Sequence, residues 1–288
     1  MKALFALLSA ILLLNACGKS ANPAETRATI DFKRVQWYAK RANAAYQSAD
    51  EIRREFPDTI LVASTPKGVQ YFLEKDNSKG VQVLVIRGTD NLANIREDAE
   101  CVESRNSKLG IYVHNGFDED AQQIFEDILP RLDKSRELIV TGHSLGAAVS
   151  TILMMYFHEE GFTLGPSINF GQPKVTNKAG VEKYRSLPLL RVVDKDDPVP
   201  LVPPNDLIDS IHGDYEHLGA EILLLHGKYY VYADRHVARK LSVDSFWKNL
   251  GNEHVSDHRM VHYLHNIAEK LIAAVQVPYD KRLAYLEN

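Results

Sequence analysis

The chain has 288 residues, of which 45% are apolar and 25% are charged, and its 34 Lys and Arg residues nearly balance its 38 Asp and Glu residues. This is the composition of an ordinary globular protein, and it excludes a collagen-like, low-complexity or largely disordered chain. The formal charge of −4, with both signs mixed along the sequence, argues against nucleic acid as a partner.

The N-terminus, residues 1–16, has the pattern of a signal peptide. Lys2 precedes an unbroken run of small or apolar residues from Ala3 to Leu14. As a helix this run would span about 18 Å, whereas the hydrocarbon core of a bilayer is about 30 Å thick. An export signal is therefore favoured over a permanent transmembrane anchor.

Cys17 follows this run in the sequence Leu14-Asn15-Ala16-Cys17, which resembles a bacterial lipobox. The resemblance implies that Cys17 becomes lipidated and that residues 17–29, which are small and polar, form a flexible tether. Gly18, rather than an Asp, follows this cysteine, which resembles the outer-membrane sorting pattern of Gram-negative lipoproteins. We therefore expect an exported bacterial lipoprotein at the outer membrane, facing the periplasm or the cell surface. A plain secretory signal followed by a free cysteine is the alternative.

Residues 30–288 show no second linker, no composition break and no internal repeat, which indicates one domain. Strand-like and helix-like segments alternate along it, and this alternation predicts an α/β fold with a largely parallel sheet covered by helices on both faces. We expect helices over 32–49, 117–132, 147–157 and 261–275, and strands over 59–63, 69–73, 81–86, 138–140, 167–170 and 189–193, with a hairpin around 226–227.

The sequence Gly142-His143-Ser144-Leu145-Gly146 lies between an apolar strand and an alanine-rich helix. This is the setting of a nucleophile elbow, in which the two glycines make room for a tight turn and the serine hydroxyl is exposed at its tip. The pattern predicts that Ser144 is a nucleophile. A purely structural turn is the alternative.

A serine hydroxyl needs a histidine to take its proton and an acid to orient that histidine. In hydrolases with this elbow, the acid and then the histidine follow the serine along the chain. Asp194, Asp196 and Asp197 all lie where a predicted strand ends before a proline-containing loop. Residue types alone do not choose among these three aspartates.

His258 is the preferred histidine because it lies where a loop meets the last predicted helix, whereas His262 and His265 fall inside that helix. The four-residue spacing of His254, His258 and His262 also raises the possibility of a metal site. This alternative is disfavoured, because His254 precedes the expected start of the helix and the chain has no His-Glu-x-x-His pattern.

From about Ile30 to Val275 the chain resembles the class 3 lipases, the fungal-lipase-like branch of the α/β-hydrolases. Four segments carry the resemblance: the strand end Val85-Ile86-Arg87-Gly88-Thr89, the helix start His114-Asn115-Gly116-Phe117, the elbow, and Phe170-Gly171-Gln172-Pro173-Lys174-Val175-Thr176-Asn177. Ile86 replaces the usual aromatic residue, and Lys174 and Thr176 also depart from the family pattern.

The resemblance implies an α/β-hydrolase fold and selects Asp197, in Asp197-Pro198-Val199-Pro200, as the acid of the triad. Asp194 and Asp196 then become loop or surface residues. It further implies that His258 is the base and that the backbone N–H groups of Thr89 and Leu145 form the oxyanion hole. The segment beginning at His217 resembles a structural signature of the family.

The function implied is that of a serine hydrolase cleaving carboxylic esters of glycerolipids through an acyl-enzyme, like a triacylglycerol lipase, without a cofactor or metal. Alternatives with the same triad are a phospholipase A1 or lysophospholipase, a peptidase and a thioesterase. A non-catalytic envelope lipoprotein that keeps the fold for binding is the alternative from another class.

Residues 91–104 lie where this family tends to have a lid over the nucleophile. Leu92, Ile95, Ala99 and Val102 recur at helical spacing, which predicts a helix with one apolar face. The alternative is an ordinary surface helix packed on the core.

Overall fold

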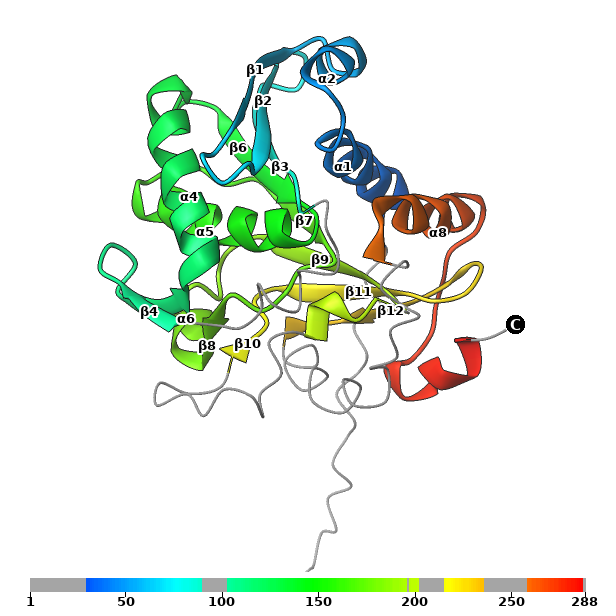
Figure 1. Ribbon diagram of the computed structural model, residues 1–288. Coiled ribbons are helices and arrows are strands. Elements are labelled where there is room, and N and C mark those ends of the chain that lie inside the picture. The colour runs from blue at the N-terminus through cyan, green and yellow to red at the C-terminus, as the bar shows by residue number, and fades with distance from the viewer. Residues whose placement is uncertain (1–29, 90–102, 196, 202–214, 236–257, 287–288) are drawn as a thin grey trace, which may run out of the picture.

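The computed structural model describes residues 30–89, 103–195, 197–201, 215–235 and 258–286 (Figure 1). Its central layer consists of two sheets, with strand orders β1-β2-β3-β6 and β7-β9-β11-β12-β13. The strands of the first sheet are Thr59–Ser64 (β1), Gln70–Asp76 (β2), Val81–Ile86 (β3) and Glu137–Gly142 (β6). Those of the second are Ser167–Phe170 (β7), Leu189–Asp194 (β9), Ala220–Leu224 (β11), Tyr229–Ala233 (β12) and Val275–Gln276 (β13).

The two sheets meet where β6 lies beside β7. Parallel bridges join Leu138 to Leu164 and His143 to Phe170, and the Ser144 N–H donates to the Phe170 carbonyl at 3.0 Å. The middle of the layer is parallel, since β3 pairs with β6, and β9 pairs with both β7 and β11, in that sense. Only the flanking pairs β1/β2, β2/β3 and β11/β12 are antiparallel.

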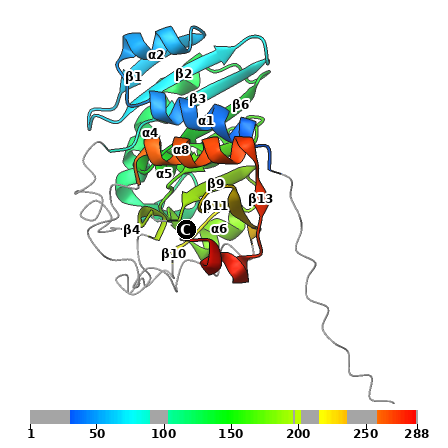
Figure 2. The same cartoon turned by 90° about the vertical axis from the view of Figure 1, so that its right-hand side faces the viewer.

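Helices cover both faces of this layer because its strands are apolar on both faces. In β3, Val83 and Val85 pack toward one cluster of core residues, and Leu84 and Ile86 pack toward the other, as the two-residue period of a strand requires. The first cluster also contains residues of Phe32–Ala44 (α1) and Met260–Ile272 (α8), and the second contains residues of Asn115–Ile128 (α4) and Leu145–Glu159 (α5). Figure 2 shows α1 and α8 side by side across one face of the sheet.

The remaining elements lie at the periphery. A small antiparallel sheet has the order β10-β8-β5-β4, formed by Tyr215–Glu216 (β10), Thr176–Asn177 (β8), Ile111–His114 (β5) and Glu103–Asn106 (β4). Two short helices are Ala49–Glu55 (α2) and Lys178–Lys183 (α6). Three 3-10 segments are Leu129–Arg131 (η2), Val199–Leu201 (η3) and Tyr279–Tyr285 (η6). Within the described residues, no helix is both long and apolar enough to cross a bilayer.

The expected fold class is confirmed, but several element boundaries differ from the sequence prediction, and three of these differences change an element's identity or extent. The first predicted helix is two helices, because Ser48 caps α2 through a capping box with Glu51 and so separates Ala49 from α1. The last helix ends at Ile272, and Val275 instead pairs with β12. Glu103 and Ser104 belong to strand β4 rather than to a helix.

Candidate active site

Ser144 occupies a strained turn between β6 and α5. Its φ of 58° and ψ of −130° lie outside the regions that L-residues favour, and within the described residues it is the one non-glycine residue with a positive φ. Such a conformation costs on the order of 1–3 kcal/mol, which the surrounding structure must supply. The backbone of the turn is fixed by two bonds: the Ser144 N–H donates to Phe170, and the Gly142 N–H donates to the Asn169 side-chain oxygen at 3.2 Å.

Three glycines make this turn possible by allowing backbones to approach one another. A Cβ on Gly142 would collide with the backbone of Gly146, and a Cβ on Gly146 would lie 2.6 Å from the Arg87 carbonyl oxygen. A Cβ on Gly88 would lie 2.8 Å from the Ser144 Cβ. The elbow is therefore packed directly against the end of β3.

Asp197 and His258 form a buried pair although 61 positions separate them in the chain. His258 Nδ1 lies 2.8 Å from Asp197 Oδ2, and both side chains are fully buried. Asp197 follows β9, and its Oδ1 accepts from the Val199 N–H at 2.9 Å. The Tyr263 hydroxyl, from the first turn of α8, also donates to Asp197 Oδ2. The carboxylate thus fixes the position of the imidazole ring.

The electrostatics of the pair favour an ionised aspartate. Burial by itself raises the pKa of the Asp197 carboxyl, but the adjacent His258 and the hydrogen bonds from His258, Tyr263 and Val199 outweigh it, and the pKa is lowered. In turn, burial and the charge of Asp197 raise the pKa of the Tyr263 hydroxyl well above its usual value. At neutral pH Asp197 is therefore an anion and Tyr263 a neutral donor.

The two atoms that a triad needs for reaction are left available. Ser144 Oγ and His258 Nε2 are both buried, and within the described part of the chain neither has a hydrogen-bond partner. With Nδ1 bonded to Asp197 as a donor, the neutral ring carries its lone pair on Nε2. In unliganded hydrolases the bond between nucleophile and base is often long and tightens only on substrate binding. The pair can therefore deprotonate a serine hydroxyl once substrate is bound.

Thr89 and Leu145, the two predicted oxyanion donors, flank the serine. Leu145 is the first residue of α5, so its N–H is one of those that a helix N-terminus leaves without an intrahelical acceptor. Thr89 follows Gly88, the residue packed against Ser144, and is half-buried. Both residues thus lie at the end of the sheet where the elbow is.

Two residues of the site were not identified from the sequence. Gly171 has a φ of +53°, and a Cβ there would lie 2.8 Å from both Asp197 Oδ2 and His258 Cε1. Its lack of a side chain leaves the space that the acid and base occupy. Tyr263 supplies the second side-chain donor to Asp197, after His258. Gly171 lies in a segment that carries the family resemblance, but only the tertiary structure brings it against the triad.

One expectation for the competing aspartates was wrong. Asp194 is not a surface residue: it is 5% exposed at the end of β9 and accepts from the Asn266 side chain at 3.1 Å. His262 and His265 lie within α8, as expected, and are exposed. Cys17, Asp196, His254, Asp257 and residues 91–102 of the expected lid lie outside the described residues. Within the described residues, no group of His, Cys, Asp or Glu has metal-site geometry.

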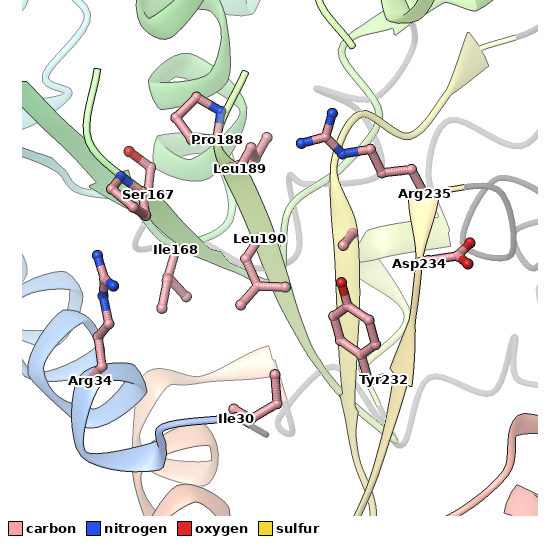
Figure 3. A pocket seen from close by; sticks show the side chains of 12 residues that line it. Ile30, Arg34, Ser167, Ile168, Pro188, Leu189, Leu190, Tyr232, Asp234 and Arg235 are labelled. Carbon is pink, nitrogen blue, oxygen red and sulfur yellow. The ribbon is translucent and has the colours of Figure 1, made fainter. Parts of the chain in front are cut away.

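A groove of about 530 Å³ lies at the opposite end of the sheet (Figure 3). Its lining includes Ser167, Leu189 and Ala220, which begin β7, β9 and β11, together with Arg34 and Arg235. Ser144 and Asp197 instead follow the carboxyl ends of β6 and β9. The groove is therefore separate from the candidate active site.

A nucleophile elbow after a parallel strand, followed along the chain by an acid and a histidine at the carboxyl edge of the sheet, defines an α/β-hydrolase. Comparisons with known proteins narrow this class. Residues 83–207 match the family model described as lipase (class 3).

Three relatives illustrate the similarity. The chain is 26% identical over 206 residues to the secreted mono- and diacylglycerol lipase 1 of Fusarium solani, covering 63% of this chain and 62% of that protein. It is 28% identical over 139 residues to the chloroplastic phospholipase A1 PLIP2 of Arabidopsis thaliana, covering 44% of this chain and 20% of that protein. The crystal structure of a lipase from Rhizopus microsporus var. chinensis superimposes with a TM-score of 0.59 and 25% identity, covering 67% of this chain and 74% of the other. The matched segments thus span less than two thirds of these two curated relatives.

Proposed function

We propose that the protein is a serine hydrolase that cleaves carboxylic esters of glycerolipids. The observation that carries this proposal is the buried hydrogen bond between Asp197 and His258, combined with the strained elbow at Ser144. The match of residues 83–207 to the class 3 lipase family model and the similarity to a mono- and diacylglycerol lipase support the choice of substrate.

In this reaction Ser144 Oγ attacks the ester carbonyl while His258 Nε2 takes its proton. Asp197 holds the imidazole in the required tautomer and stabilises the imidazolium that forms. The N–H groups of Thr89 and Leu145 bind the oxyanion of the tetrahedral intermediate, where one donor typically contributes about 2.7–4 kcal/mol. His258 then donates its proton to the departing alcohol, and water hydrolyses the acyl-enzyme by the same steps.

The experiment is a substrate panel assayed on purified wild-type protein and on Ser144→Ala. We expect the wild type to hydrolyse emulsified tri-, di- and monoacylglycerols and soluble short-chain esters. Ser144→Ala should lose nearly all of this activity while keeping the wild-type circular dichroism spectrum. Wild-type turnover in Ser144→Ala, or loss of turnover with a chelator, would exclude the serine mechanism.

Phospholipase A1 activity with the same triad is the second candidate, favoured by the similarity to a plant phospholipase A1. The same panel distinguishes the two candidates when it includes diacyl phosphatidylcholine and the matching lysophospholipid. A kcat/KM for phospholipid at least tenfold above that for diacylglycerol would favour the phospholipase.

We also propose that the protein is exported and anchored to a membrane through lipidated Cys17. The support is the short apolar run before Cys17 and its resemblance to a lipobox. Two or more acyl chains would give stable anchoring, where a single chain is marginal.

A further inference from the structure

The elbow residue beside the nucleophile, His143, is linked by hydrogen bonds to two other parts of the site. His143 Nε2 lies 2.6 Å from the backbone carbonyl oxygen of His258, and His143 Nδ1 lies 2.7 Å from the Tyr46 hydroxyl. The Tyr46 hydroxyl also accepts from the Gly88 N–H at 3.1 Å. Tyr46 comes from the turn after α1, far in sequence from all three partners.

The donors and acceptors in this chain of bonds have one consistent direction. A carbonyl oxygen only accepts, so His143 Nε2 carries the hydrogen. Burial, and secondly the nearby His258, lower the pKa of His143 to about 3, so the ring is neutral and Nδ1 accepts from the Tyr46 hydroxyl. Tyr46 in turn uses an oxygen lone pair to accept from Gly88. Each hydrogen-bond donor in this chain, from the Gly88 N–H to His143 Nε2, therefore faces an acceptor.

The chain of bonds connects the two parts of the site that must be aligned for reaction. At one end, Gly88 precedes Thr89, the proposed oxyanion donor, and is packed against Ser144. At the other end, His258 carries the base. The His143 and His258 rings also lie face against face, with centroids 4.5 Å apart and planes tilted by 32°. A neutral His143 is needed there, because His258 becomes a cation during the reaction.

The position of Tyr46 is itself fixed from both sides. The Gln70 side-chain amide, at the start of β2, donates to the carbonyl oxygens of Ala45 and Gln47 at 2.8 Å each. The Gln70 backbone carbonyl accepts from the Arg87 N–H at 2.8 Å, so Gln70 is also bonded to the residue that follows β3. One glutamine thus holds the turn that carries Tyr46 against the strand end that carries Gly88.

We propose that Tyr46, acting through His143, is a positioning residue. It aligns the backbone at Gly88 and Thr89, which carries the proposed oxyanion donor, with the base His258. This inference rests on the proposed function and adds a residue to its machinery. The side chain of Tyr46 need not touch the substrate. Its loss should therefore slow the chemical step more than it weakens substrate binding.

The experiment measures kcat and KM for a soluble short-chain p-nitrophenyl ester with the wild type and Tyr46→Phe. We expect Tyr46→Phe to lower kcat by about 10- to 100-fold, since displacements of about 1 Å in a site cost up to that much, and to change KM by less than about threefold. Inactivation by a p-nitrophenyl phosphonate should slow by a similar factor. In that reaction the Ser144 oxygen–phosphorus bond forms, p-nitrophenolate leaves, and His258 takes the serine proton.

Tyr38→Phe is the matched control. Tyr38 lies in α1 and is buried, and Tyr38→Phe likewise removes a hydrogen-bonded hydroxyl, which here donates to the Pro166 carbonyl. It should lower the melting temperature but leave kcat within about twofold of the wild type. If Tyr46→Phe also keeps kcat within twofold, while Ser144→Ala is inactive, the positioning role is wrong and the proposed function stands. Substantial activity in Ser144→Ala would overturn both.

If Tyr46→Phe does not fold, a second pair of variants tests whether the hydrogen bonds of His143 position the site. His143→Gln keeps an N–H donor for the His258 carbonyl, whereas His143→Phe keeps a flat ring against His258 but no polar atom. We expect His143→Gln to retain at least about tenfold more kcat than His143→Phe. Equal kcat in the two variants would show that packing alone matters at this position.

Discussion

The charge of Asp197 is stabilised inside the protein because three donors face one carboxylate. His258, Tyr263 and the Val199 N–H all bond to it, whereas Asp194, buried only a few residues away at the same strand end, bonds to Asn266. The two aspartates are alike in residue type, burial and position along the chain. They differ in whether a histidine ring is in contact with the carboxylate.

This difference predicts unequal effects of the same substitution. Asp197→Asn should lower kcat by about 10⁴-fold, because an amide can hold the imidazole in the wrong tautomer without disturbing the fold. Asp194→Asn should keep kcat within a few fold. The measurement is kcat for a soluble ester, with circular dichroism to check folding. Similar losses in both variants would mean that Asp197 has no special role.

The buried His143 predicts an acid-sensitive fold. Its pKa is about 3 in the native protein, below the value of about 6.5 in an unfolded chain. The contribution of neutral, buried His143 to the free energy of unfolding is therefore fully present above about pH 6.5 and is lost as the pH falls toward 3. His217, whose pKa burial also lowers well below the usual value, acts in the same direction.

Urea unfolding at several pH values between about 5.5 and 4 tests whether buried His143 makes the fold acid-sensitive. One fewer proton taken up on unfolding should make the slope of the unfolding free energy against pH smaller by about 1.4 kcal/mol per unit in His143→Gln. His265→Gln, on an exposed part of α8, should keep the wild-type slope. Parallel curves for the wild type and His143→Gln would contradict a neutral native His143.

At the scale of elements, the site depends on how closely the turn after β7 approaches the triad. Gly171→Ala puts a methyl group 2.8 Å from Asp197 and His258 at a backbone with φ +53°. Gly227→Ala is the matched control, because Gly227 has a φ of +60° in the β11–β12 hairpin and nothing lies within 4 Å of its added Cβ.

Both alanine variants should lose about 1–2 kcal/mol of stability from the left-handed backbone. Only Gly171→Ala should also lose kcat, by about 100-fold, through displacement of the acid and base. Thermal melts and ester hydrolysis on the two proteins measure both effects. Equal kcat in the two variants would show that the turn at Gly171 does not support the triad.

The sequence predicts elements well where the signal is local. The strand 81–86 and the strand–turn–helix around Ser144 were predicted closely, because an apolar run and two glycines specify them without help from the rest of the chain. Predicted helix ends failed where a cap or a strand pairing decides, as at Ser48 and Val275. Gly171, Tyr263 and Tyr46 could not be found from the sequence, since their contacts join segments that are far apart in the chain.

At the scale of the whole molecule, the candidate active site and the groove lie at opposite ends of the sheet. The elbow and the Asp197–His258 pair lie at the carboxyl edge, as expected for a parallel α/β sheet. Ile30, where the described chain begins, instead lines the groove at the amino edge (Figure 3). The described chain thus starts at the edge of the sheet away from the candidate active site.

Anchoring through Cys17 predicts where cells hold the protein. The wild type should fractionate with membranes, and its mature mass should include diacylglycerol and a further acyl chain. Cys17→Ser should block lipidation and alter processing, while the esterase activity of the folded domain remains. Intact-mass analysis that finds a mature protein with an unmodified Cys17 would contradict the anchor and leave the hydrolase proposal unaffected.

The central claim, that Ser144 is the nucleophile of a serine esterase, is tested most directly by covalent labelling. The purified protein is treated with a p-nitrophenyl phosphonate, and intact-mass and peptide-mapping spectra are recorded. We predict one phosphonyl group per chain, on Ser144, with esterase activity falling in proportion to labelling and no label on Ser144→Ala. Full esterase activity in the labelled protein, or a label that maps to another residue and still abolishes activity, would contradict the account.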